Sequence, residues 1–313
     1  MRNSKPITVG LELEMLKLTP HAPRLIELRN FGRRHDASIA DKQGKLLPKT
    51  GLGAGVELVT PILEVATEVA PDGEAGKFDF TGITPVVKDL LACAQVYNSS
   101  CGIHVHLGRP NGEQTDWNPR RLAGHLGGPA SEWKPGHVRT MLLIGLGLEN
   151  IIFNLVPETR KQNQTCRRLR ELYNTKDIAN YYPLVNLNTR KYDNPQRYCW
   201  LNLIETRRQQ DPREERVGYA RSKAFGTFEV RALGETINLD YIMAWTQLWV
   251  KIAAAVAYLP SESAALRCLY SNWLQEDFDK LTALKAKHER EVAPLVRSVV
   301  PVRNHTTDVE AED

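Results

Sequence analysis

The most restrictive feature of the chain is a strict alternation of side-chain type near its N-terminus. Over residues 9–15 every second residue is apolar, and Glu12 and Glu14 lie between these apolar positions. A period of two is that of a β-strand, whose successive side chains point to opposite faces. The segment is therefore predicted to be a strand with one apolar face and one acidic face.

Three other segments carry related residues in the same arrangement. Residues 101–108 are predicted to form a strand with His104 and His106 on one face. A further strand is predicted over residues 224–233, with Glu229 and Arg231 on one face, and Glu57 lies in a short strand over residues 56–59. Each pair alone is typical of a solvated strand face or a surface ion pair. Their repetition on four strands indicates a site.

The carboxylates on these strands limit the chemistry of such a site. On adjacent strands they would repel one another and would not all stay ionised without cations. Oxygen-rich ligation with one imidazole suits Mg²⁺ or Mn²⁺, whereas a zinc site would contain more Cys or His. The pattern therefore predicts a divalent-metal site on one face of the sheet.

Strands and helices are grouped without strict alternation, which favours an α+β fold over a doubly wound sheet. Apolar spacing predicts a helix that begins at Thr84 and Pro85, and further helices over residues 137–156, 158–173, 240–258, 261–274 and 276–290. Residues 19–34 are interpreted as a connection, and short strands are expected at residues 35–39 and 197–203. The Gly- and Pro-rich residues 109–135 are predicted to form a loop, with a lid and a structural loop both left open.

The size of the chain permits one large domain or two smaller ones. It has 313 residues, of which 42% are hydrophobic and 25% charged, enough for a sizeable core. We expect a single catalytic domain over residues 1–300, with a helical part over residues 259–300 and a flexible tail over residues 301–313.

Charge, hydropathy and cysteine content exclude several classes of protein. The net charge is only +4, which argues against nucleic-acid binding. Basic residues are concentrated between positions 160 and 170, and this cluster fits either a solvated helix face or a phosphate-binding surface. Residues 141–156 are interrupted by polar side chains and fall short of the roughly 20 apolar residues of a membrane span. The N-terminus has no apolar signal core, and the five cysteines form no C-x-x-C pair. A cytoplasmic protein with reduced thiols is expected.

Four motifs resemble, in order, those of the amidoligase family, carboxylate–amine ligases related to glutamine synthetase and glutamate–cysteine ligase. They are G-L-E-L-E at residues 10–14, G-V-E-L-V-T-P at 55–61, C-G-I-H-V-H at 101–106 and T-F-E-V-R at 227–231. Weaker matches lie at residues 35–38, where Ala37 replaces the glycine of the family, and at residues 160–166, 197–202 and 236–245. The resemblance covers about residues 7–258.

The resemblance implies a fold and a reaction. The fold would be a curved antiparallel sheet that forms an open half-barrel, is backed by helices, and binds ATP with Mg²⁺ or Mn²⁺ on its concave face. The reaction would join the carboxylate of a small molecule or peptide to an amine through an acyl phosphate, with release of ADP and phosphate.

The resemblance also assigns roles to individual residues. Glu12, His104 and Glu229 would hold the metal that bridges the ATP phosphates. Glu14 and Glu57, together with Asp36, would hold a second metal near the acyl phosphate. Arg231 would stabilise the transferred phosphoryl group, so Arg231 and Glu57 are the expected catalytic residues. Contacts to nucleotide or substrate are expected from His106, Arg160 and Arg197.

Three alternative functions remain open at the level of sequence. A guanidino-type phosphotransferase on the same fold would stop at phosphoryl transfer. A cupin-like metal oxygenase is suggested by the two histidines followed by Glu113, but this reading leaves the strand carboxylates unexplained. The third is a non-catalytic binding protein that has kept the fold. The sequence does not indicate the acid, the amine or the oligomeric state.

Overall fold

A computed structural model of the chain describes residues 6–35, 39, 55–68, 77–96, 98, 100–108, 133, 135–161, 166–172, 198–202, 227–259, 261–270 and 272–297. Its centre is an antiparallel, eight-stranded sheet that does not close into a barrel, with the path β3-β4-β1-β8-β10-β9. Strand β1 also pairs with β5, which in turn pairs with β6. The strands of this sheet are β1 (Ile7–Met15), β3 (Gly32–His35), β4 (Val56–Val59), β5 (Leu63–Glu68), β6 (Lys77–Asp79), β8 (Ile103–Gly108), β9 (Leu201–Asn202) and β10 (Phe228–Leu233). Strands β2 (Lys17–Leu18) and β7 (Ala94–Val96) form a separate pair.

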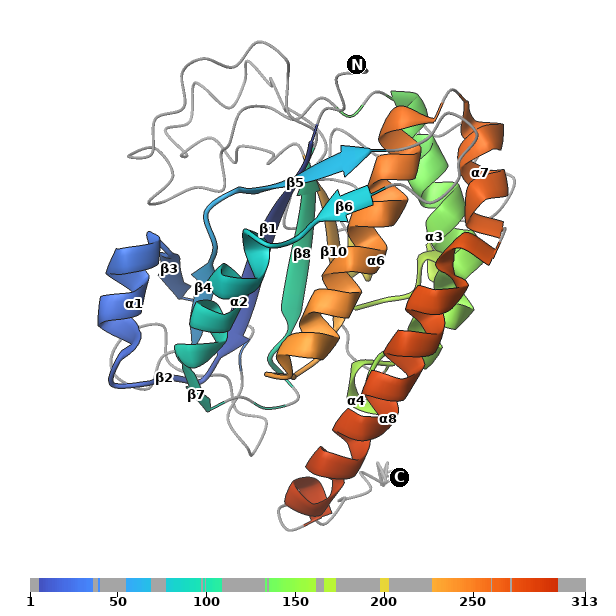
Figure 1. Cartoon of the computed structure of the whole chain (residues 1–313). Coiled ribbons are helices and arrows are strands. Elements are labelled where there is room, and N and C mark those ends of the chain that lie inside the picture. Colours follow the sequence, from blue (N-terminus) through green and yellow to red (C-terminus); the bar gives the residue numbers. More distant parts are fainter. Residues whose placement is uncertain are drawn as a thin grey trace, which may run out of the picture.

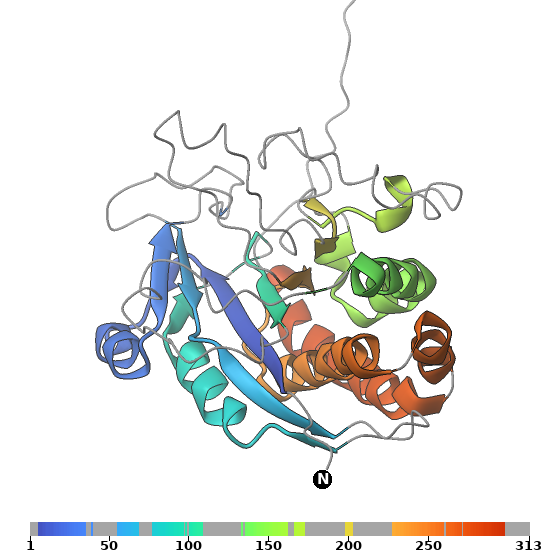
Figure 2. The same ribbon diagram turned by 90° about the horizontal axis from the view of Figure 1, so that it is seen from above.

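Helices cover one face of this sheet (Figures 1 and 2). The helices are α1 (Ala22–Arg29), α2 (Ile83–Ala92), α3 (Pro135–Leu155), α4 (Glu158–Lys161), α6 (Leu239–Tyr258), α7 (Glu262–Tyr270) and α8 (Gln275–Arg297), with 3₁₀ turns η2 (Leu169–Glu171) and η8 (Asn272–Leu274). Helices α2 and α6 contact the sheet, and α3, α7 and α8 contact α6. The molecule is thus an α+β protein, as predicted.

The hydrophobic core lies between the sheet and these helices. Leu11, Val105 and Val230, from three neighbouring strands, are completely buried, as are Trp245 and Trp249 of α6. Burial of such large apolar side chains is the main driving force of folding. This packing fixes which face of each strand points away from the helices.

The face away from the helices carries the charged residues because of the pairing register. Glu12 is the direct partner of His104, and Glu229 is the direct partner of His106. Directly opposite residues of an antiparallel pair lie on the same face. The shared face predicted for the carboxylates and histidines is therefore confirmed, and the three central strands bring them side by side.

Strand β10 contains a bulge beside this group. Val230 pairs with Val105 and Leu233 pairs with Ile103, so β10 uses one residue more than β8 between the two pairs. A bulge leaves an extra residue out of the ladder and changes the direction of nearby side chains. Arg231 lies within this bulge.

Most predicted elements are confirmed with small shifts of their ends. Strand β4 has the predicted limits, and α3 and α6 lie within two residues of theirs. The helix predicted to begin at Thr84 begins one residue earlier, at Ile83, and its N-cap residue Gly82 provides no side-chain hydrogen bond.

Two interpretations of longer segments are wrong. Residues 19–34 are not only a connection, because they contain α1 and β3; Asn30, with φ 54°, ends α1 in the left-handed conformation typical of helix ends. In the described part of residues 158–173, where one helix is predicted, only α4 and the turn η2 are helical. The backbone of Arg167 bonds instead to Tyr198 and Trp200, and Leu169 N donates to the buried carboxylate of Glu149. Such tertiary bonds override local helix propensity.

Helix α3 is the one described helix whose length and composition would permit a membrane crossing, over Gly136–Leu155. Packing buries 67% of its most apolar window inside the protein. This burial is that of a core helix, and α3 contacts α6, α7 and α8.

Candidate functional site

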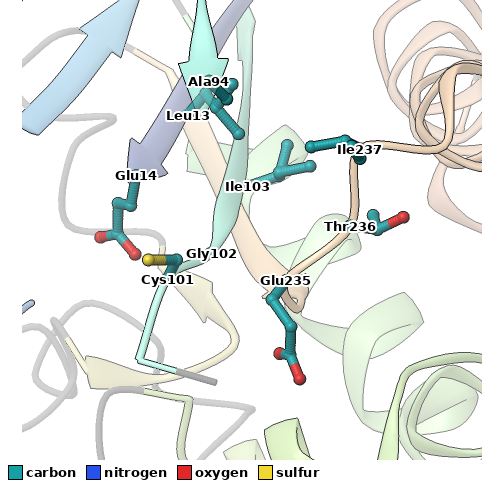
Figure 3. A pocket seen from close by; sticks show the side chains of 9 residues that line it. All are labelled: Leu13, Glu14, Ala94, Cys101, Gly102, Ile103, Glu235, Thr236 and Ile237. Atoms are coloured by element: carbon teal, nitrogen blue, oxygen red, sulfur yellow. The ribbon is translucent and has the colours of Figure 1, made fainter. Parts of the chain in front are cut away.

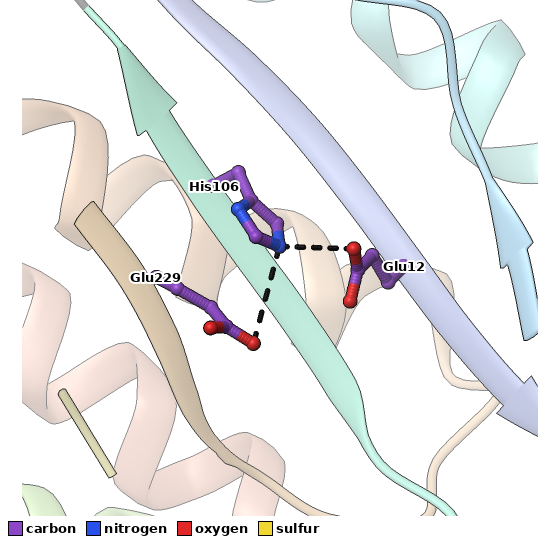
Figure 4. Close-up of side chains that lie close together, drawn as sticks. All are labelled: Glu12, His106 and Glu229. Carbon is purple, nitrogen blue, oxygen red and sulfur yellow. Dashed lines mark ion pairs between the residues drawn. The ribbon is translucent and has the colours of Figure 1, made fainter. Parts of the chain in front are cut away.

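Glu12 contacts two histidines of the charged group on the sheet, and Figure 4 shows its contact with His106. Its Oε2 lies 3.0 Å from His104 Nδ1, and its Oε1 lies 3.1 Å from His106 Nε2. The three residues are between 2% and 5% exposed. One buried carboxylate therefore contacts two buried imidazoles.

Glu229 approaches the same histidines from the neighbouring strand. Its Oε1 lies 3.4 Å from His104 Nδ1 and 4.0 Å from His106 Nε2, and it also accepts a hydrogen bond from Arg231 Nη1. Its Oε2 accepts a hydrogen bond of 2.7 Å from Asn202 Nδ2 of β9. Because each oxygen of Glu229 has a defined partner, its carboxylate is held in one orientation.

Three of these residues have the geometry of a metal-ligand set. Glu12, His106 and Glu229 each offer one ligand atom, and these atoms lie within 4.8 Å of one another at buried positions. Two carboxylates with one imidazole suit Mg²⁺, Mn²⁺ or other divalent ions of similar chemistry. The Nδ1 of His106 lies 3.0 Å from Thr227 Oγ1, the kind of second contact that orients a ligating imidazole.

His104, for which the resemblance predicts a metal-ligand role, lies between this set and a second group of carboxylates. Its Nδ1 faces Glu12, and its Nε2 lies 3.6 Å from Glu14 Oε1. The structure therefore places His104 within the cluster and groups His106 with Glu12 and Glu229.

Glu14 and Glu57 form the second carboxylate group. They are direct partners on β1 and β4. On the other side of β4, Arg34 is the direct partner of Glu57, with its Nη1 3.6 Å from Glu57 Oε1. Sequence analysis missed Arg34, because the signal that identifies it is the pairing of β3 with β4.

The ionisation of these groups follows from their burial and their neighbours. Burial raises the pKa of Glu229, but the guanidinium of Arg231 and the two histidines lower it more, so that its pKa is about 2. Burial likewise opposes ionisation of Glu12, yet His106 and His104 hold its pKa well below 4.5. Burial and the charge of Arg231 lower the pKa of His104. The site therefore holds ionised carboxylates and a His104 that favours its neutral form, which is the form that ligates metals.

Of the remaining predicted site residues, only Arg160 belongs to the described part of the chain. Arg160 is buried outside the charged cluster and donates to the main chain of Arg231. Asp36 and Arg197 lie outside the described residues. The same holds for Glu113 and most of the predicted loop over residues 109–135, although Trp133 is described and donates its Nε1 hydrogen to Leu107 O at 3.1 Å.

A small pocket lies at the end of β1 and β8, next to the cluster (Figure 3). Glu14 and Cys101 lie on one side of it and Glu235 on another. Leu13 and Ile103, which belong to the core face, also line it. The pocket therefore adjoins Glu14 but does not contain the Glu12–His106–Glu229 set.

Part of the chain is similar to a known protein family. A family model described as "Putative amidoligase enzyme" matches residues 24–127, about a third of the chain. The matched part includes Glu57, His104 and His106, whereas Glu12 and Glu229 lie outside it. No curated protein and no solved structure gives a significant match. The family description supports an enzyme of ligase type. Residues 24–127 are thus similar to the amidoligase family.

Proposed function

We propose that the protein is an ATP-dependent carboxylate–amine ligase with a glutamine-synthetase-like fold. The observation that carries this proposal is the buried set of Glu12, His106 and Glu229 on one face of an open antiparallel sheet, next to Arg231. Buried carboxylates at such short separations are expected to bind cations. The family match to an amidoligase supplies the reaction class.

The donor sets fit two divalent ions. Glu12 and Glu229 with an imidazole of the His104–His106 pair would hold one ion, and Glu14 with Glu57 would hold another. Asp36 is proposed to assist the second set. Mg²⁺ or Mn²⁺ bound there would neutralise charge on the phosphate oxygens of ATP.

The proposed reaction has two steps. A carboxylate oxygen of the acid attacks the γ-phosphorus of ATP, the bond from that phosphorus to the β–γ bridging oxygen breaks, and ADP leaves. The amine nitrogen then attacks the acyl carbon, phosphate leaves with the former carboxylate oxygen, and the nitrogen loses a proton. Acids and amines of small-molecule or peptide type are the proposed substrates.

Arg231 is the residue that we propose to act on the transferred phosphoryl group. Its side chain is 13% exposed and lies against Glu229, which keeps the guanidinium charged next to the proposed metal set. A fixed positive charge at this position stabilises the charge that develops on the phosphoryl oxygens. Glu57 is proposed as the second catalytic residue through the ion near the acyl phosphate.

The test uses the purified chain with ATP, Mg²⁺ and panels of acids and amines. We expect phosphate and ADP only when both an acid and an amine are present, and a product that has lost one water. Oxygen-18 in the substrate carboxylate should appear in the released phosphate. Release of AMP, or phosphate without the label, would contradict the mechanism. A stable phosphorylated product formed without an amine would instead indicate a phosphotransferase.

A further inference from the structure

The side chain of Arg160 is buried and directed at main chain. Arg160 is 1% exposed, and its Nε and Nη2 both donate to the carbonyl oxygen of Arg231, at 3.1 and 2.8 Å. No carboxylate in the described part of the chain forms an ion pair with it. Two donors on one acceptor define both the position and the plane of that carbonyl group.

The carbonyl group that accepts these two hydrogen bonds belongs to Arg231, which lies in the bulge of β10. Arg231 is between Val230 and Leu233, where β10 has one residue more than β8. On its other side, the Arg231 amide donates to Trp200 O at 2.7 Å. The main chain of Arg231 is therefore held at both its N–H and its C=O group. A bulge changes the direction of a side chain, and these bonds fix the changed direction.

The neighbouring residues leave space for this guanidinium. A Cβ atom at Gly102 would lie 2.5 Å from Arg160 Nη2 and 3.0 Å from its Cζ. Glycine at this position therefore permits the close approach of the side chain to the start of β8. The backbone oxygen of the same glycine accepts a hydrogen bond from Glu14 N at 3.1 Å. The Arg160 guanidinium thus packs where β8, β10 and β1 meet.

We infer that Arg160 is a positioning residue that holds the β10 bulge and so directs Arg231 toward Glu229. This role differs from the contact to nucleotide or substrate that the family resemblance predicts for Arg160. Its buried Nε and Nη2 are bound to protein, which leaves Nη1 as the guanidinium nitrogen without a hydrogen-bond partner among the described residues. The part of the inference that concerns turnover depends on the proposed ligase function, whereas the part that concerns the backbone does not.

The test compares Arg160→Met and Arg160→Lys with a matched control, Arg170→Met. Arg170 lies in the same part of the sequence and also donates to a main-chain oxygen, Leu146 O at 3.0 Å. Its side chain is 53% exposed, and its Nε lies 3.7 Å from Oε1 of the buried Glu149. Gly102→Ala is a fourth variant, which keeps Arg160 and displaces its guanidinium. Phosphate release, affinity for a non-hydrolysable ATP analogue with Mg²⁺, and hydrogen exchange in residues 228–233 are measured for each.

For Arg160→Met we expect kcat to fall on the order of 10- to 100-fold, because small displacements of a catalytic group have effects of this size. Nucleotide affinity should stay within about threefold of the unaltered chain, since the lost interaction acts on turnover and not on binding. Exchange in residues 228–233 should become faster. Gly102→Ala should also lower kcat and make exchange in residues 228–233 faster. Arg160→Lys should lose less kcat than Arg160→Met. Arg170→Met should have the kcat and the exchange rates of the unaltered chain.

Two results would overturn the inference. A loss of nucleotide affinity as large as the loss of kcat would make Arg160 a nucleotide contact. Unchanged exchange in residues 228–233 would show that Arg160 does not hold the bulge. If Arg160→Met does not fold, Arg160→Lys and Gly102→Ala decide the same question. If the unaltered chain releases no phosphate with any acid and amine, the proposed function fails, and the exchange data still decide the role of Arg160.

Discussion

The carboxylate of Glu12 reaches His106, which is not its partner in the β-ladder. Glu12 pairs with His104, and His106 pairs with Gly10, yet Glu12 Oε1 lies 3.1 Å from His106 Nε2. The carboxylate therefore contacts both histidines of β8 and lies close to Glu229 across that strand. Binding of a divalent ion should depend on this one side chain more than on any other member of the cluster.

The first prediction is that Glu12→Gln weakens Mn²⁺ binding by at least about 10-fold, because the change removes a charge and a ligand while it keeps the shape. Titration calorimetry, with circular dichroism as a check of the fold, measures this loss. Glu64→Gln is the control, since Glu64 is an exposed residue on β5, a strand that also pairs with β1. Equal affinities in the two variants would show that the metal site is placed wrongly.

The second prediction distinguishes the two histidines. His106 belongs to the set with Glu12 and Glu229, whereas the family resemblance assigns the metal to His104. On geometry we expect His106→Ala to weaken Mn²⁺ binding more than His104→Ala does. The same titration decides the order. A larger loss in His104→Ala would support the assignment by family resemblance and would imply that the imidazoles exchange roles when the ion binds.

The third prediction concerns Arg231. Arg231→Ala should slow phosphate release on the order of 10²-fold or more, as for other arginines that act on a transferred phosphoryl group. A coupled assay for phosphate measures the rate. Arg33→Ala, at an exposed position on β3, should leave the rate unchanged. A rate in Arg231→Ala close to that of Arg33→Ala would remove Arg231 from the mechanism.

The fourth prediction concerns packing beneath the sheet. A Cβ atom at Gly145 of α3 would lie 2.7 Å from Leu201 Cδ2 and 2.8 Å from Leu169 Cδ1, whereas one at Gly136 would have no neighbour within 4 Å. Overpacking of this kind costs about 1–3 kcal/mol, which exceeds the gain of roughly 1 kcal/mol in helix propensity. Gly145→Ala should therefore lower the free energy of unfolding in urea, and Gly136→Ala should not. The opposite order would show that the Leu169 and Leu201 side chains move aside freely.

The fifth prediction concerns the pH dependence of stability. Burial lowers the pKa of His288 below its ordinary 6.5, although Glu235 and two glutamates of α8 oppose this shift. The folded state therefore binds fewer protons than the unfolded state below pH 6.5, so the free energy of unfolding falls as the pH is lowered through that range. The slope from one histidine is at most about 1.4 kcal/mol per pH unit. His288→Gln should remove this part of the slope in urea titrations between pH 7.5 and about 5. An unchanged slope would show that His288 does not contribute.

The sequence predicts the faces of the strands well because alternation is a local property. The side chains of Glu12, His104 and Glu229 share a face in the structure as the period of two requires. The helix α6 is equally predictable, since its apolar spacing is long and Asn238 caps it by accepting a hydrogen bond from Tyr241 N. In both cases the pattern that predicts the element lies within about 20 consecutive residues.

The pairing of strands is not local, and this limits what the sequence reveals about the site. The neighbourhood of Arg34 and Glu57 depends on β3 lying next to β4. Similarly, no property of Arg160 itself shows that its guanidinium binds the carbonyl group of Arg231, which is 71 residues away. A partner of this kind is recognised only when the sheet is assembled. The family resemblance selected Arg160 as a site residue but did not predict its hydrogen bonds to the Arg231 carbonyl group.

The burial of β1 on both faces has a consequence for changes in chain length. The strand pairs with β8 along one edge and with β4 and β5 along the other, and eight of its nine residues are buried. Insertion or deletion of a single residue near Gly10 would turn Leu11 and Leu13 toward the charged face and would force Glu12 and Glu14 into the apolar core, because the side-chain period is two. Insertions in surface loops in general are tolerated far better. The spacing within β1 is therefore a condition of the fold and of the ligand set at the same time, and an error there would remove both.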